Sequence, residues 1–196
     1  GEPYVPQAEF SFPSPYVPLH ARLRDYALAS FTPGRPLPES ALHLMHRVHA
    51  DFTYAPASTQ VTTPVLEAFE EKRGVCQDYA HVMIGCLRAL GLAVRYVSGY
   101  LVSQPPPGQA RLIGADASHA WVSVHCPGLP TNGGWLDLDP TNDLVPGGGH
   151  VTVAYGRDYG DVTPLRGVIR GGGEHDLTVR VTVMPWDEAP EELALP

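Results

Sequence analysis

Hydrophobic positions in the first half of the chain recur at the spacing of a helix. Apolar residues three and four apart predict helices over residues 19–30 and 39–54, and a third over residues 62–74. The stretch 76–90 is apolar on nearly all sides, and Gly91 follows it. A helix with that pattern is buried by its neighbours, so we expect residues 76–90 to form the central helix of the domain.

Strand patterns replace helical ones after Gly91. Runs rich in β-branched and aromatic residues, separated by turn residues, predict five strands. These strands span residues 92–103, 118–126, 134–140, 150–156 and 176–184. Because the helices come first and the strands second, we expect an α+β fold in which the central helix packs against a mostly antiparallel sheet.

The N-terminal segment has a different composition from the rest of the chain. Residues 1–18 contain five prolines, which predict an extended lead-in laid over a surface, or a linker from a preceding segment. The remaining residues, 19–196, have the length of one domain.

Composition excludes several classes of protein. The chain carries 13 Lys and Arg against 21 Asp and Glu, a net charge of −8, so we expect no nucleic-acid partner. No run approaches the roughly 20 apolar residues of a membrane span. Three cysteines are too few for a disulfide framework. With no signal-peptide pattern at the N-terminus, these features favour a cytoplasmic location.

Cys76 is the first candidate for chemistry. It begins the predicted central helix, where the helix dipole favours the nucleophilic thiolate, and Gly74 lets the backbone turn closely before it. Cys86 lies in the middle of the same helix and is expected to be an inert core thiol. Asp78, in the first turn, is expected to accept backbone N–H groups rather than take part in catalysis. A lone cysteine is more often a core residue, so Cys76 needs partners.

Two later strands offer such partners. Strand alternation places His119 on the same face as Trp121, where its ring could take the thiol proton. Asp137 and Asp139 share one face of the run 134–140, and either carboxylate could orient the histidine. Taken singly, a strand histidine and an aspartate in a DPTN turn have structural explanations as well.

Four motifs in this order resemble the transglutaminase-like superfamily of papain-type cysteine enzymes. They are RGVCQDYAH at 73–81, LRALGLAVRYVSGY at 87–100, SHAWVSV at 118–124 and GWLDLDPTN at 134–142. The later YGRDYGDVTPLRG is similar to the bacterial cysteine-protease branch, whose members often carry a β-rich domain upstream. The resemblance covers about residues 40 to 155 and implies a papain/transglutaminase-like core within a catalytic domain, residues 19–196.

The resemblance also assigns roles to residues. It implies that Cys76 is the nucleophile, His119 the base and Asp139 the orienting acid, because the family's acid directly precedes the proline of its D-P-T. Asp137 remains the rival on the same face. Tyr54 occupies the position of the family's side-chain donor to the oxyanion, although an aromatic residue there could equally pack under a loop.

The implied activity is cysteine-dependent acyl transfer on amide bonds of a protein or peptide, through a thioester and without a cofactor. We expect hydrolysis by a protease or amidase. The alternatives are a cross-linking transglutaminase, which uses the same triad, and a non-catalytic peptide-binding module. A metal site is disfavoured because its candidate ligands show no metal-binding spacing: Cys76, His81, His119, His125 and Cys126.

Overall fold

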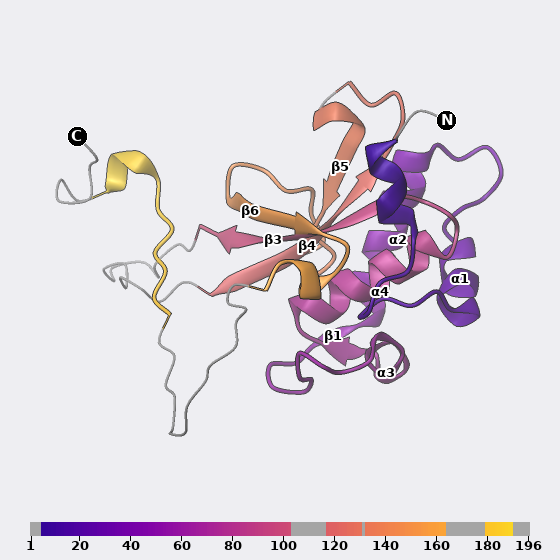
Figure 1. Cartoon of the computed structure of the whole chain (residues 1–196), viewed down its shortest axis with the longest axis horizontal. Helices are drawn as coiled ribbons and strands as arrows, with labels where there is room; N and C mark the ends of the chain where they lie inside the picture. The colour runs from indigo at the N-terminus through magenta and orange to yellow at the C-terminus, as the bar shows by residue number, and fades with distance from the viewer. Residues whose placement is uncertain (1–4, 103–116, 131, 164–178, 190–196) are drawn as a thin grey trace.

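The computed structural model describes residues 5–102, 117–130, 132–163 and 179–189. Helices precede the main sheet along the chain, as expected (Figure 1). The α-helices are α1 (Ala21–Leu28), α2 (Leu37–Asp51), α3 (Val65–Glu71) and α4 (Cys76–Arg88). The strands are β1 (Thr53–Tyr54), β2 (Arg73–Gly74), β3 (Val94–Leu101), β4 (Ser118–His125), β5 (Trp135–Leu138) and β6 (His150–Gly156). The described residues also form four short 3-10 helices: η1 (Pro6–Ser11), η2 (Asn132–Gly134), η3 (Tyr159–Asp161) and η4 (Trp186–Glu188).

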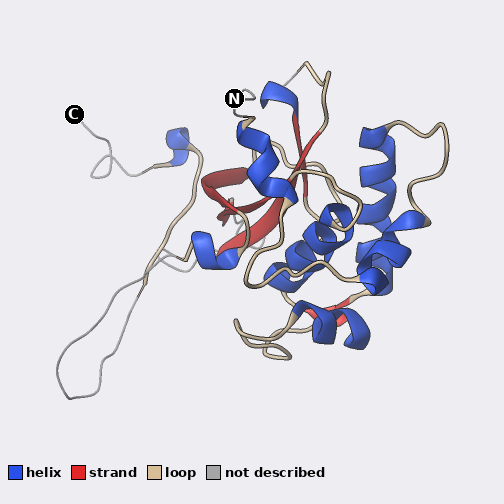
Figure 2. Ribbon diagram, turned by 45° about the vertical axis from the view of Figure 1, so that its right-hand side comes forward, coloured by secondary structure: helices blue, strands red, loops and turns tan. Residues whose placement is uncertain are grey.

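Helix α4 is the centre of the domain. Every residue from Gln77 to Arg88 is buried, as the apolar pattern predicted. Helices α1, α2 and α3 pack around it on one side, and β3 and β4 cover another (Figures 1 and 2). The helix therefore has little freedom to move, and its first residue is held in a fixed place.

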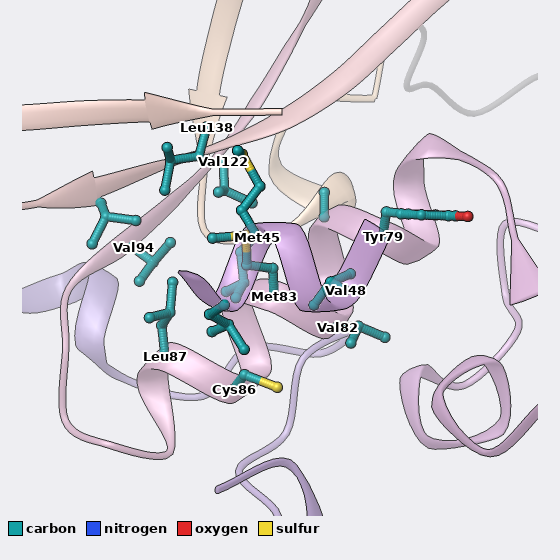
Figure 3. Close-up of a cluster of buried hydrophobic side chains, with 14 of the residues drawn as sticks. Met45, Val48, Tyr79, Val82, Met83, Cys86, Leu87, Val94, Val122 and Leu138 are labelled. Carbon is teal, nitrogen blue, oxygen red and sulfur yellow. The ribbon is translucent and has the colours of Figure 1, made fainter. Parts of the chain in front are cut away.

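The four-stranded sheet has the order β5-β4-β3-β6, and all of its neighbouring strands are antiparallel. Alternation gives it two faces. Val94, Val122 and Leu138 lie on the face that packs against Met83 and Leu87 of α4 (Figure 3). The predicted arrangement of a central helix on an antiparallel sheet is confirmed. Residues that alternate with these along each strand, including His119, lie on the opposite face of the sheet.

The proline-rich segment is tied to the domain at several points. Residues Pro6–Ser11 form η1 rather than extended chain, since proline is well suited to the start of a helix. Val17 is fully buried in the core. The guanidinium of Arg88, itself buried in α4, donates to the carbonyl of Phe10 and to the Ser14 hydroxyl. This segment therefore covers part of the core.

Two local expectations differ from the structure. The helix predicted to reach residue 54 ends at Asp51, and Thr53–Tyr54 instead pair in parallel with Arg73–Gly74, directly before α4. In the run predicted as a strand over 176–184, the described residues 179–184 form none, and 176–178 lie outside the described part. A run of strand-forming residues becomes a strand only where a partner strand meets its backbone hydrogen bonds. No described helix is long and apolar enough to cross a membrane.

Candidate active site

Cys76 is the first residue of α4, and its surroundings hold that helix end firmly. Oδ2 of Asp78 accepts the Val75 N–H at 2.8 Å and the Thr59 hydroxyl at 2.6 Å. Asp78 therefore caps the helix, as expected. Gly74 is required here, because a Cβ atom would lie 2.5 Å from that carboxylate. The turn thus leaves the Cys76 thiol at a rigid, partly exposed helix N-terminus.

The three cysteines lie in different environments. Cys86 is fully buried, and burial raises the pKa of its thiol to about 12 despite the nearby charges of Lys72 and Arg47. Cys126 is also buried, and burial raises the pKa of its thiol. Cys76 alone among them is partly exposed. A thiol must be reached by a substrate to act as a nucleophile, so Cys76 is the candidate.

His119 links Cys76 to a carboxylate. Its Nε2 lies 2.8 Å from Oδ2 of Asp139, which leaves Nδ1 as the ring nitrogen available to the nearby Cys76 thiol. Burial by itself lowers the pKa of His119, but the hydrogen bonds and charges of Asp139 and Cys76 outweigh it and raise the pKa to about 9. The protonated imidazolium is therefore stabilised between a thiol and a carboxylate.

Asp139 is fully buried directly after β5, and both of its oxygens are engaged. Oδ1 accepts the backbone N–H groups of Thr141 and Asn142 at 3.0 and 3.2 Å, which builds the DPTN turn. Oδ2 accepts from His119, and from the Asn142 side chain at 2.8 Å. Burial raises the pKa of Asp139, but these bonds, with one from His150, lower it to about 2. The same aspartate serves the turn and the histidine.

Asp137 lies on the same face but has a different neighbour. It pairs with Ser123 across β4 and β5, and its charge acts on Arg95. The Arg95 guanidinium is stacked between the rings of Trp135 and Tyr155, 3.8 and 3.9 Å from their centres. Asp139, and not Asp137, meets the His119 ring.

Tyr54 stands at the mouth of the cleft. Its side chain is half-exposed, and burial together with the nearby Cys76 raises the pKa of its phenol. A cavity of about 440 Å³ is lined by Tyr54, Leu101, His119, Thr141 and Asn142. The short pairing of β1 with β2 brings Tyr54 to this place, because β2 leads directly into α4.

His150 is a site residue that the sequence reasoning missed. Its Nε2 lies 3.0 Å from Oδ2 of Asp139, the oxygen that also hydrogen-bonds His119. His150 starts β6, far along the chain from the other members, and a single histidine at the start of a strand gives no signal of its own.

The five candidate metal ligands named from the sequence do not form one cluster, although Cys76 and His119 are neighbours. His81 is buried, accepts the Tyr159 N–H and stacks on Tyr16, and burial lowers the pKa of His81 to about 4. His125 packs on Trp135. Within the described residues, the one group with donor atoms close enough for an ion is His119, Asp139 and His150. Both rings there already hydrogen-bond the carboxylate, so the group is satisfied by its own contacts.

The segment GRDYGDV, residues 156–162, forms a hydrogen-bonded turn after β6. Arg157 forms a two-pronged ion pair with Asp161. The buried Asp158 accepts the backbone N–H groups of Tyr16 and Gly160. These contacts fasten the N-terminal segment to the end of β6.

Comparisons with known proteins found similar proteins in sequence and in fold. A crystal structure from Cytophaga hutchinsonii, described provisionally as a cysteine protease, has a TM-score of 0.65 and 28% identity, over 83% of this chain and 50% of that one. A protein-glutamine gamma-glutamyltransferase of Pseudomonas aeruginosa is 32% identical over 136 residues, which is 66% of this chain and 20% of that protein.

Relatives of higher identity are of unknown function. An uncharacterised protein of Mycobacterium tuberculosis is 49% identical over 166 residues, which is 84% of this chain and 53% of that protein. The chain thus spans about half the length of the mycobacterial relatives that it matches. A family model described as the transglutaminase-like superfamily matches residues 27–140. Since that match covers more than half of its length, the chain belongs to the transglutaminase-like superfamily.

Proposed function

We propose that the protein hydrolyses amide bonds of a protein or peptide through a thioester on Cys76, with Cys76, His119 and Asp139 as the catalytic triad. One observation carries the proposal. The His119 ring hydrogen-bonds the buried Asp139 carboxylate at Nε2, and the thiol of the helix-terminal Cys76 is near enough to raise the pKa of the ring. A nucleophile, a base and a residue that orients the base are thereby within reach of one another.

Acylation uses the proton that the pair shares. His119 Nδ1 accepts the thiol proton, and Cys76 Sγ attacks the carbonyl carbon of the substrate. The negative oxygen of the tetrahedral intermediate lies toward the Cys76 N–H and the Tyr54 hydroxyl, two donors at the same cleft. The C–N bond then breaks, and Nδ1 returns the proton to the leaving amine. A thioester remains on Cys76.

Deacylation repeats these steps with water. Neutral His119 removes a proton from water, the hydroxide attacks the thioester carbonyl, and the C–S bond breaks. The sulfur regains the proton from His119, and a carboxylic acid leaves. Asp139 stays ionised throughout, because its low pKa keeps it charged, and it stabilises the imidazolium that forms twice in the cycle.

The cleft favours an extended substrate over a small enclosed one. Leu101 and Tyr54 offer apolar surface, while Thr141 and Asn142 offer polar groups, in a cavity that is open beside His119. A peptide can lie across such a cleft with its scissile carbonyl at Cys76. The similarity to the Cytophaga hutchinsonii structure supports the hydrolytic version.

Transamidation is the second candidate. It is favoured by the 32% identity to the Pseudomonas aeruginosa gamma-glutamyltransferase. The acylation half is the same, but an amine rather than water attacks the thioester. In that case His119 accepts the proton of the amine, an isopeptide bond forms as the C–S bond breaks, and the proton passes from His119 to the sulfur. The two reactions differ in what the cleft admits during the second half.

Trapping the acyl-enzyme separates these candidates. The protein would be incubated with a peptide library, with and without a primary amine and with EDTA as a further arm, and analysed by mass spectrometry. Hydrolysis predicts a Cys76 adduct and free acid even in excess amine, with no effect of EDTA. Amine adducts would identify a transglutaminase. Peptide binding with neither product, or full activity in Cys76→Ser, would contradict the thiol mechanism.

A further inference from the structure

We propose that His150 is a positioning residue for the catalytic pair: it holds the Asp139 carboxylate in place and limits how strongly that carboxylate binds the proton of His119. The inference rests on the proposed function of the triad. It is carried by three independent features of the described residues: the contacts at one oxygen, a bulge in β6, and the packing of Trp121.

The first feature is the crowding at Oδ2 of Asp139. This oxygen accepts three hydrogen bonds. They come from Nε2 of His119 at 2.8 Å, Nε2 of His150 at 3.0 Å and Nδ2 of Asn142 at 2.8 Å. A carboxylate oxygen accepts only, so both histidines donate an N–H to it. His150 therefore competes with His119 for the same negative charge. The side chain of His150 is 9% exposed, so water does not readily take its place.

The second feature is a β-bulge that turns His150 toward the site. Ser98 faces Ala154, but Gly99 faces Thr152, so Val153 is an extra residue in β6. Regular alternation from Tyr155 would put His150 on the α4 face of the sheet. One inserted residue reverses that parity, so that His150 pairs with Leu101 and lies on the face of His119.

The third feature is the wall behind the two histidines. The Trp121 ring is stacked on His119 at 6.0 Å and meets the His150 ring edge to face at 5.1 Å. Gly99 makes room for it, because a Cβ atom there would lie 2.5 Å from the Trp121 ring. The fully buried tryptophan thus fixes the relative orientation of both rings.

As a consequence, the attraction between His119 and Asp139 is weaker than it would be without the hydrogen bond from His150. His119 must hold a proton as an imidazolium and then give it to the leaving group. The charged or titratable groups that face Asp139 and His119 among the described residues are His150 from β6, Cys76 from α4 and Tyr54 from β1. Without the hydrogen bond from His150, Oδ2 attracts the His119 proton more strongly. The orientation of the Asp139 carboxylate is then also less constrained.

A matched pair of variants tests this role. His150→Gln keeps an N–H donor near the place of Nε2, whereas His150→Met has nearly the same size and no donor. His125→Met is the control, because His125 lies at the far end of β4 against Trp135. The readouts are the pH profile of Cys76 alkylation by iodoacetamide, which needs no substrate, and kcat and KM for a peptide found in the acyl-enzyme screen.

His150→Met should lower kcat about 10- to 100-fold with KM nearly unchanged, as the loss of a hydrogen bond to a charged group commonly does. The basic limb of the pH profile measured for the His150→Met variant should move about one pH unit higher, because His119 then holds its proton more tightly. His150→Gln should restore both, and His125→Met should change neither. If the Met variant does not fold, His150→Asn replaces it, since its shorter amide stops short of Oδ2.

Three results would overturn the proposal: wild-type profiles in the Met variant, no recovery in the Gln variant, or the same changes in His125→Met. If the alkylation profile moves as expected while no peptide is turned over, the positioning role holds and the hydrolytic function fails. If peptides are turned over but neither the alkylation profile nor kcat changes in the Met variant, the hydrolytic function holds and the positioning role fails.

Discussion

Replacing Asp139 by asparagine tests the electrostatic account of the triad through folding stability. The rise of the His119 pKa from 6.5 to about 9 corresponds to about 3 kcal/mol of stability. Because the folded pKa is the higher one, this contribution is complete below pH 6.5 and is lost as the pH rises through 9. Asp139, with its pKa lowered to about 2, contributes above pH 3.8 and loses that contribution only in stronger acid.

Asp139→Asn removes the charge that raises the pKa of His119. Burial then dominates at that ring and favours its neutral form. Between pH 6.5 and 9 the variant should therefore lose little or no stability, whereas the parent should lose up to about 3 kcal/mol. In a triad, the corresponding aspartate-to-asparagine change lowers kcat about 10⁴-fold, and a loss of similar size is expected here.

The assay is urea unfolding at closely spaced pH values from 6 to 9.5, in a Cys76→Ser background that removes the titration of the thiol. This background also removes the part of the His119 pKa rise that Cys76 supplies, so the parent should lose less than about 3 kcal/mol there. Asp137→Asn is the matched control, because it makes the same change two residues away, on the same face but beside Arg95. A parent-like pH slope in Asp139→Asn would refute the reasoning. So would loss of the slope in Asp137→Asn.

Three further predictions test the thiol, the oxyanion donor and the buried His81. Iodoacetamide at neutral pH should label partly exposed Cys76 much faster than buried Cys86, and equal rates in a peptide map would remove Cys76 as the nucleophile. Tyr54→Phe should lower kcat about 10²–10³-fold with KM nearly constant, as loss of one oxyanion donor does; unchanged turnover would assign the ring to packing. His81, whose pKa burial lowers to about 4, should make the protein lose stability as the pH falls from 6.5 to 4, by about 3 kcal/mol. Urea unfolding of His81→Asn over that range should show a shallower slope, and an unchanged slope would contradict this account.

The sequence predicted the elements that depend on local pattern. The apolar stretch beginning at Cys76 could only be a buried helix, and the spacing of Gly74 and Asp78 around it indicated a tight, capped start. Alternation in the run 118–126 placed His119 on the same face as Trp121. These inferences succeeded because each depends on neighbours within a few residues along the chain.

The choice between the two aspartates was beyond the local pattern. Asp137 and Asp139 share a face, so alternation cannot separate them, and the resemblance to the family was needed to favour Asp139. The structure separates them by their surroundings: Arg95 stands beside one, and the His119 ring meets the other. Which charged group lies beside each residue depends on strand order and register, and neither is written in the strand itself.

The sequence by itself determined which residue types are available for chemistry and which helix presents the thiol. The tertiary structure alone decided that His150 joins them. Regular alternation along β6 places His150 on the core side, and the single extra residue at Val153 reverses its direction. A bulge places two residues of one strand opposite one residue of its partner, so it depends on the pairing with β3 as much as on β6. For that physical reason, the contact between His150 and Asp139 exists only in the folded sheet.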